Sequence, residues 1–301
     1  MPTRRLALAA VLLISAQLSP ALAQDKPNDG KLNVVATFSI LADLVKNVGG
    51  DRVEVKSLVG PNGDAHVYQP TPNDAKTVSD AKLVFVNGLG FEGWMARLVK
   101  ASGTKAAMIT ATKGVKPRKM EEGGHSEADP HAWQSVPNAK VYVTNIYDAL
   151  AAADPAGKAT YAANTAAYLA KLDALDVQVR AAVAAIPADR RKIITTHDAF
   201  GYFGAAYGVA FIAPQGVSTE SEVSARDVAK IITQIRKQKI PAVFLENVTD
   251  ERLLRRIGEE SGARIGGTLY SDALTDEKGP APTYLDMMRH NVKQLAEALT
   301  S

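Results

Sequence analysis

Apolar runs bounded by turn residues alternate with amphipathic stretches along most of the chain. In the first half this pattern predicts strands over residues 32–36, 53–59 and 82–87, and a helix over residues 40–45. The run at 82–87 is nearly continuous in apolar character, as is typical of a parallel strand that is buried on both faces. The first half therefore predicts an α/β domain.

A long stretch without glycine or proline runs from residue 158 to residue 186. Within it, large apolar and aromatic residues follow one another at steps of three, four or seven; they are Tyr161, Tyr168, Leu172, Leu175, Val179, Val183 and Ile186. These steps place all of them on one face of a helix of about thirty residues. Pro187 is expected to end this helix.

The alternation of strands and helices resumes after the long helix, with strands predicted over residues 192–196, 242–246 and 263–267. The predicted organisation is a signal peptide at 1–23, an N-terminal α/β domain at 24–154, a connecting helix at 155–187 and a C-terminal α/β domain at 188–301. The fold class is thus two parallel-sheet α/β domains joined by one long rigid helix. Because ligands of such sheets collect beyond the carboxyl ends of the strands, we expect the site in the interdomain cleft.

The N-terminus carries Arg4 and Arg5, an apolar run over residues 6–18 and small residues before Gln24, a pattern that predicts a cleaved secretory signal peptide. An uncleaved anchor is the weaker alternative, because the run is shorter than the roughly 20 residues that span a bilayer. The sequence has no cysteine, which excludes disulfides, a thiolate metal site and a lipid-modified cysteine. We therefore expect a free periplasmic protein.

Charge gives no indication of nucleic-acid binding. The net charge of the chain is +3, and it falls to +1 without residues 1–23, which hold two arginines and no acidic residue.

Three of the five histidines lie in predicted loops. His66 stands in a turn-rich segment after the strand at 53–59, His131 precedes a helix expected to start near Pro137, and His197 directly follows the strand at 192–196. A single histidine at a strand end is more often a surface or hydrogen-bonded residue than a ligand. Several imidazoles together suit zinc, however, since imidazole is the commonest metal ligand.

Asp272 follows the last predicted strand, where a fixed carboxylate could complete a tetrahedral site. Its residue type and position are more typical of a turn or helix-capping aspartate, and the pattern alone favours that role.

Four segments give the chain a specific resemblance to a known family. They are Gly63-Asp64-Ala65-His66-Val67-Tyr68-Gln69-Pro70, Asp129-Pro130-His131-Ala132-Trp133, residues 196–203 starting Thr-His-Asp, and Tyr270-Ser271-Asp272. With them the chain resembles, over nearly its whole length after residue 23, the zinc and manganese substrate-binding proteins of ABC importers, among them the ZnuA-like and AztC-like zinc receptors. The resemblance implies that His66, His131, His197 and Asp272 are the metal ligands, two from each domain. It also implies that the metal is zinc. Members with glutamate as the third ligand tend to handle manganese, whereas here that position is His197.

Three further residues have open roles. Many zinc receptors carry a long histidine-rich and acidic loop before the second ligand, whereas here only His125 stands among four nearby carboxylates. We favour a solvated acidic loop over an auxiliary capture site there. His290 is expected on the surface of a C-terminal helix. Glu246, at a strand end, is either a support for a ligand or an exposed acid.

The function that the sequence predicts is that of a periplasmic zinc-binding protein that delivers Zn²⁺ to a membrane ABC permease. A manganese receptor of the same family and, less favoured, a zinc hydrolase are the alternatives. A catalytic zinc keeps a position open for water, and the sequence lacks the His-Glu-x-x-His motif. A receptor for an organic metal chelate would instead need an apolar lining. We expect a monomer that is not an enzyme, with a periplasmic zinc chaperone as a further candidate partner.

Overall fold

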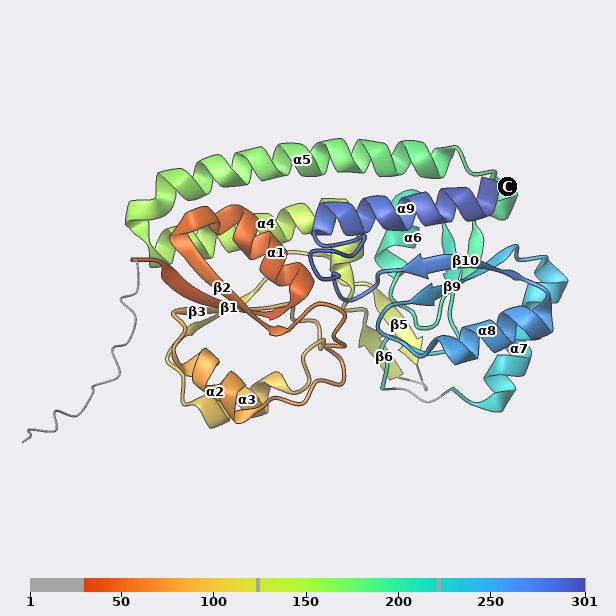
Figure 1. Ribbon diagram of the computed structural model, residues 1–301, viewed down its shortest axis with the longest axis horizontal. Helices are drawn as coiled ribbons and strands as arrows, with labels where there is room; N and C mark the ends of the chain where they lie inside the picture. Colours follow the sequence, from red (N-terminus) through yellow and green to blue (C-terminus); the bar gives the residue numbers. More distant parts are fainter. Residues whose placement is uncertain (1–29, 123–124, 221–222, 301) are drawn as a thin grey trace, which may run out of the picture. The chain divides into compact units, whose positions relative to one another are not determined.

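The computed structural model describes residues 30–122, 125–220 and 223–300, without the side chains of residues 120–126. Lys31–Ser301 form one compact unit that contains two parallel four-stranded sheets (Figure 1). The predicted signal peptide at 1–23 lies outside the described residues. We call each sheet with its helices a lobe.

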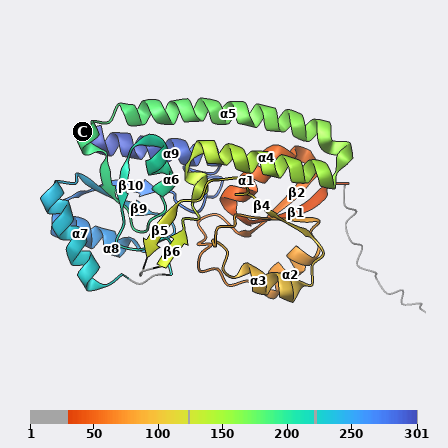
Figure 2. The ribbon, with the colours of Figure 1, turned by 180° about the vertical axis from the view of Figure 1, so that it is seen from behind.

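The N-terminal lobe is built on the sheet β2-β1-β3-β4. Its strands are β1 (Leu32–Phe38), β2 (Val53–Val59), β3 (Leu83–Val86) and β4 (Ala107–Thr110), and all pairs are parallel. Helices α1 (Ser39–Gly49) and α4 (Val136–Ala153) cover one face, and α2 (Pro72–Ser79) and α3 (Met95–Ser102) lie on the other side (Figures 1 and 2).

The C-terminal lobe repeats this topology in the order β10-β9-β7-β8. Its strands are β7 (Lys192–Ile194), β8 (Ala210–Ile212), β9 (Ala242–Glu246) and β10 (Arg264–Leu269), and its helices are α6 (Gly201–Tyr207), α7 (Ala225–Gln238), α8 (Glu251–Ser261) and α9 (Tyr284–Thr300). The sequence pattern missed β4 and β8. Both are edge strands of only four and three residues, and their short apolar runs, Ala107-Met108-Ile109 and Ala210-Phe211-Ile212, are exposed or half-buried.

The predicted connecting helix is α5 (Lys158–Ala184), which follows a short 3-10 turn, η3 (Pro155–Gly157). The residues of its predicted face are buried, but Ile186 lies after the helix end rather than within it. Helix α9 runs along α5 (Figures 1 and 2). One continuous apolar cluster contains residues of both lobes, such as Val34 and Phe244, so the lobes are joined by packed side chains as well as by chain.

The predicted two-domain α/β class is confirmed by these two sheets, while the residue boundaries of the predicted domains stay predictions. The remaining turns are η1 (Gly50–Arg52), η2 (Ala132–Gln134) and η4 (Ala188–Arg190). In the described part of the chain, no helix has the length and apolar character to cross a bilayer.

The acidic segment before His131 differs from its prediction as a solvated loop. Its backbone forms an antiparallel hairpin of β5 (Lys119–Glu122) and β6 (His125–Ala128), and residues 123–124 are not described. Cross-strand pairing satisfies the backbone groups here, which the charged composition of the segment does not indicate.

Candidate metal centre

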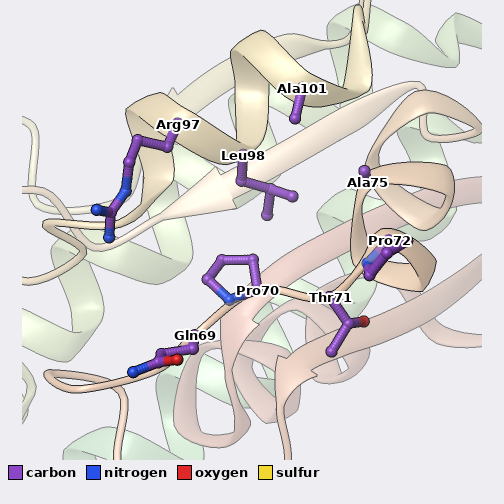
Figure 3. A pocket seen from close by; sticks show the side chains of 8 residues that line it. All are labelled: Gln69, Pro70, Thr71, Pro72, Ala75, Arg97, Leu98 and Ala101. Carbon is purple, nitrogen blue, oxygen red and sulfur yellow. The ribbon is translucent and has the colours of Figure 1, made fainter.

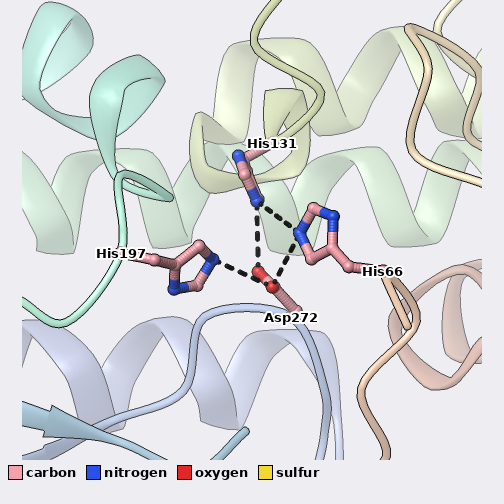
Figure 4. Close-up of side chains that lie close together, drawn as sticks. All are labelled: His66, His131, His197 and Asp272. Carbon is pink, nitrogen blue, oxygen red and sulfur yellow. Dashed lines mark hydrogen bonds and ion pairs between the residues drawn. The ribbon is translucent and has the colours of Figure 1, made fainter. Parts of the chain in front are cut away.

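The structure brings His66, His131, His197 and Asp272 together between the lobes (Figure 4). His66 comes from the segment between β2 and α2, and His131 immediately precedes η2. His197 and Asp272 each stand three residues past a strand, β7 and β10 respectively. Each lobe therefore contributes two of the four side chains. His66, His197 and Asp272 lie in loops beyond the carboxyl ends of parallel strands, and His131 follows the hairpin of β5 and β6.

One ligand-type atom from each of the four side chains lies within 4.8 Å of the others. His66 Nε2 is 3.2 Å from His131 Nε2 and 3.3 Å from Asp272 Oδ2. Asp272 Oδ2 is 3.1 Å from His197 Nε2, and Asp272 Oδ1 is 3.6 Å from His131 Nε2. The side chains of His131, His197 and Asp272 are fully buried, and that of His66 is 5% exposed.

The cluster is electrostatically unusual because it buries a carboxylate among imidazoles. Burial alone would raise the pKa of the Asp272 carboxyl, but the imidazoles of His197 and His131 hold that pKa well below its usual value. Burial lowers the pKa of the His66 imidazole, with Asp272 acting in the opposite direction. Both Asp272 oxygens are buried without a hydrogen bond of good geometry. A bound cation would give this buried carboxylate the partner that it lacks among hydrogen-bond donors.

Glu246 stands directly behind His197, because Ile194 of β7 is paired with Val243 of β9 and the two residues follow at equal distance. Glu246 Oε2 is 2.7 Å from His197 Nδ1, and Oε1 accepts hydrogen bonds from the backbone N–H groups of Thr196 and His197. With 1% of its surface exposed, Glu246 is not the exposed acid of the alternative prediction. Burial lowers the pKa of the His197 imidazole, but Glu246 and Asp272 outweigh it and raise that pKa well above its usual value.

Asp129 plays the corresponding part for His131, and the sequence analysis missed it. Its Oδ1 accepts the backbone N–H of His131 at 2.9 Å and lies 2.9 Å from His131 Nδ1. Asp64 likewise accepts the backbone N–H of His66 at 2.9 Å. An aspartate two residues before His66 and before His131, in a turn where its side chain bonds to the backbone two residues on, is the sequence signal that could have identified Asp64 and Asp129.

A cross-lobe clamp fixes Asp272 relative to His131. Trp133 and Gln134 follow closely after His131. Trp133 Nε1 and Gln134 Nε2 both donate hydrogen bonds to the Ser271 carbonyl, at 2.9 and 2.6 Å. Neighbours of two clustered residues are thus bonded to each other across the lobes.

His290 lies outside the cluster but is not the surface residue that was predicted. It is half-buried, its Nε2 is 3.0 Å from the Thr268 carbonyl, and its ring packs against Tyr270. The strand that α9 covers decides this burial, which the sequence pattern of the helix does not show. The side chain of His125 lies outside the described part of the structure, so its role stays open.

A cavity of about 400 Å³ opens onto the cluster at His66, with Phe91, Pro130 and Val217 among its lining residues. Another cavity, of about 750 Å³, lies between α2 and α3 (Figure 3). Its lining includes Pro70, Pro72 and Leu98 and none of the four clustered residues. Of these two cavities, the one at His66 is therefore the one that borders the cluster.

The profile of the family described as "Zinc-uptake complex component A periplasmic" matches residues 34–298. The chain belongs to this family. Its members are the metal-binding substrate-binding proteins of ABC importers, which are transport receptors and not enzymes, so this chain is a metal receptor of that class.

Relatives within the family carry names with different metals. The iron-binding protein YfeA of Yersinia pestis is 36% identical over 98% of this chain and 96% of its own length. The manganese ABC transporter substrate-binding lipoprotein PsaA of Streptococcus pneumoniae is 35% identical over 91% of each chain. The structure of the periplasmic zinc-binding protein TroA from Treponema pallidum is similar with a TM-score of 0.85 and 33% identity, over 90% of this chain and 99% of that one.

If Glu246 orients His197, Glu246→Gln should lower metal affinity about 10- to 100-fold, the usual effect of removing a carboxylate that supports a ligand. Calorimetric zinc titration measures this change. Asp43→Asn is the control, because Asp43 is a carboxyl of α1 that bonds to α9 and does not touch the cluster. Equal affinity of Glu246→Gln and parent would show that Glu246 does not support the site.

Proposed function

We propose that this protein is a periplasmic zinc receptor whose ligands are His66, His131, His197 and Asp272, and that it delivers Zn²⁺ to a membrane ABC permease. The observation that carries the proposal is the donor set, three imidazole nitrogens and one carboxylate converging in a buried cluster. Nitrogen donors of this kind suit zinc, which is bound by His and Asp in tetrahedral sites.

The spacing of the donors supports zinc. A tetrahedron with metal–ligand bonds of about 2.0 to 2.1 Å has edges of roughly 3.3 to 3.4 Å. Four of the contacts among the donors, at 3.1 to 3.6 Å, are of this size, and all four donors lie within 4.8 Å of one another. Zinc also stands above manganese and iron in the intrinsic order of divalent affinities at such sites.

Manganese is the second candidate cargo. Both oxygens of Asp272 face the cluster, Oδ1 toward His131 and Oδ2 toward His66 and His197, so two-oxygen binding would raise the coordination number. A higher coordination number with more oxygen suits manganese. Because relatives are named for iron, manganese and zinc, manganese and iron are the ions that must be compared with zinc as cargo.

Four protein donors around one ion favour a carrier over a zinc hydrolase, which keeps one position open for water. Metal release would then require that a donor leaves the ion. Because α5, α9 and the shared apolar core join the lobes, we infer that the loops bearing the donors move more than the lobes do.

We propose export through the signal peptide at 1–23 and a free periplasmic location, since the sequence holds no cysteine for lipid attachment. Several relatives are named as lipoproteins. Mass spectrometry of a periplasmic extract distinguishes a free protein from a membrane-anchored one. A chain that starts near Gln24 and is soluble without detergent supports the proposal, and a membrane-bound chain that retains residues 1–23 refutes it. A monomer and a zinc chaperone as partner belong to the same proposal.

Metal analysis of the purified protein, followed by competition among zinc, manganese, iron and copper, tests the cargo. One tightly bound zinc per chain, retained against manganese, is the expected result. A protein that prefers manganese or iron at equal free concentrations would refute the zinc proposal and leave a metal receptor.

Zinc affinity should fall as pH falls from 7.5 to 5. Against the effect of burial, Glu246 and Asp272 raise the pKa of the His197 imidazole, so protons compete with zinc for this nitrogen increasingly as pH falls. Each displaced proton makes affinity change roughly tenfold per pH unit below the pKa from which it leaves. Zinc titrations in several buffers give both the affinity and the protons released, and a pH-independent affinity would contradict binding by these imidazoles.

A further inference from the structure

The four clustered side chains are supported unequally. Asp129 forms hydrogen bonds with the ring and the backbone of His131. Glu246 accepts the backbone N–H of His197 and lies 2.7 Å from the His197 ring as an ion-pair partner. Asp272 follows Ser271, whose carbonyl accepts two hydrogen bonds from the other lobe. Three of the donors are therefore fixed by buried groups behind them.

His66 has no comparable support. Its Nε2 faces the cluster, while no hydrogen-bond partner contacts its Nδ1 among the residues that the structure describes. Phe91 packs against its ring, and its side chain is the one of the four with residual exposure. His66 is also the one of the four that lines the adjoining cavity of about 400 Å³. Rotation of this ring would open the cluster toward that cavity.

Asp64 differs from Asp129 in the use of its second oxygen. Both aspartates accept the backbone N–H of the histidine two residues on. Asp64 Oδ2, however, accepts a hydrogen bond of 2.6 Å from the Thr219 hydroxyl, which belongs to the other lobe. We call this contact the cross-lobe bond.

The cross-lobe bond connects the His66 segment with the His197 segment. The Thr219 carbonyl accepts a hydrogen bond of 2.7 Å from Gln215 Nε2, and Gln215 is bridged to His197 in a parallel arrangement. The start of the His66 segment is fixed separately, because the backbone N–H of Asn62 donates to the Leu274 carbonyl. Besides the contacts of the His66 ring itself with Asp272 and His197, the cross-lobe bond thus ties this segment to the other lobe only two residues before His66.

Building on the zinc-receptor function proposed above, we propose that His66 is the donor that leaves first when the ion is released, and that Asp64 and Thr219 are positioning residues which set the release rate. The bond from Thr219 holds the Asp64 carboxylate, and that carboxylate holds the His66 backbone. Loss of the bond frees the His66 segment while the other three donors stay in place. Release should then become faster, with a small effect on the rate of association.

The test measures zinc release from the loaded protein into excess chelator by stopped flow. Thr219→Val keeps the shape of the side chain and removes the hydroxyl, and it should release zinc about tenfold faster, the change expected when a hydrogen bond to a carboxylate is lost. Thr219→Ser keeps the hydroxyl and should release zinc at nearly the parent rate. Asp64→Ala removes both contacts and should be at least as fast as Thr219→Val.

Thr233→Val is the matched control, since the Thr233 hydroxyl bonds within α7 and lies outside the site. The thermal midpoint of the metal-free protein separates positioning from unfolding: Thr219→Val should lower it only by the few degrees that one lost hydrogen bond costs, and Thr219→Ser should recover it. A lower midpoint without recovery in Thr219→Ser would overturn the positioning role. Parent-like release from Thr219→Val would overturn this inference alone, whereas a parent protein that binds no zinc would overturn the proposed function as well.

Discussion

Replacing His131 or His197 with alanine is expected to lower zinc affinity by at least about 100-fold. Each variant removes a buried donor, and removing even a group behind a donor typically costs 10- to 100-fold. The fully buried carboxylate of Asp272 also loses an imidazole that lies within 3.6 Å of it. Calorimetry or competition with a chelator of known affinity gives the change.

His290→Ala is the control for these variants. It removes an imidazole that contacts Thr268 and Tyr270 outside the cluster, so zinc affinity should stay at the parent value. Circular dichroism of each metal-free variant separates loss of binding from loss of fold. If His131→Ala and His197→Ala bound zinc as tightly as His290→Ala, the proposed ligand set would be wrong.

The second large effect is expected from His197→Glu, which replaces a nitrogen donor with a hard carboxylate. Oxygen donors suit manganese better, so the dissociation constants of manganese and zinc should become more similar, although zinc should still bind. The structure adds a cost that the sequence did not indicate. The new carboxylate would lie against Glu246 as well as Asp272, and buried like charges repel each other.

The metal-free His197→Glu variant should therefore be less stable than the parent by about 3 kcal/mol, the usual scale for breaking a buried ion pair. The double variant His197→Glu, Glu246→Gln removes one of the facing charges and should recover much of this loss. Denaturant unfolding of the metal-free proteins measures stability, and paired zinc and manganese titrations measure the ratio. An unchanged or wider zinc preference in the double variant would show that the residue at 197 does not set metal choice.

Much of the fold can be predicted from short-range patterns in the sequence. The near-continuous apolar run of β3 and the helical spacing from Tyr161 to Val183 predict a buried parallel strand and a long one-sided helix, because burial on two faces or on one face determines those periods. The same patterns predicted no strand at β4 and β8, which are short edge strands whose apolar residues are exposed or half-buried. The hairpin of β5 and β6 was also not predicted, because the sequence of its strands is mostly charged and polar.

The site divides in the same way. The sequence singled out His66, His131, His197 and Asp272 through the family-like segments in which they stand, whereas the residue pattern alone favoured a turn or capping role for Asp272. Only the tertiary structure decided that these four side chains, from loops as far apart as residues 66 and 272, come within 4.8 Å of one another. It alone placed Glu246 behind His197, through the pairing of β7 with β9, and Thr219 beside Asp64. Contacts of this kind depend on strand register and on how the two lobes meet, and neither property has a local pattern in the chain.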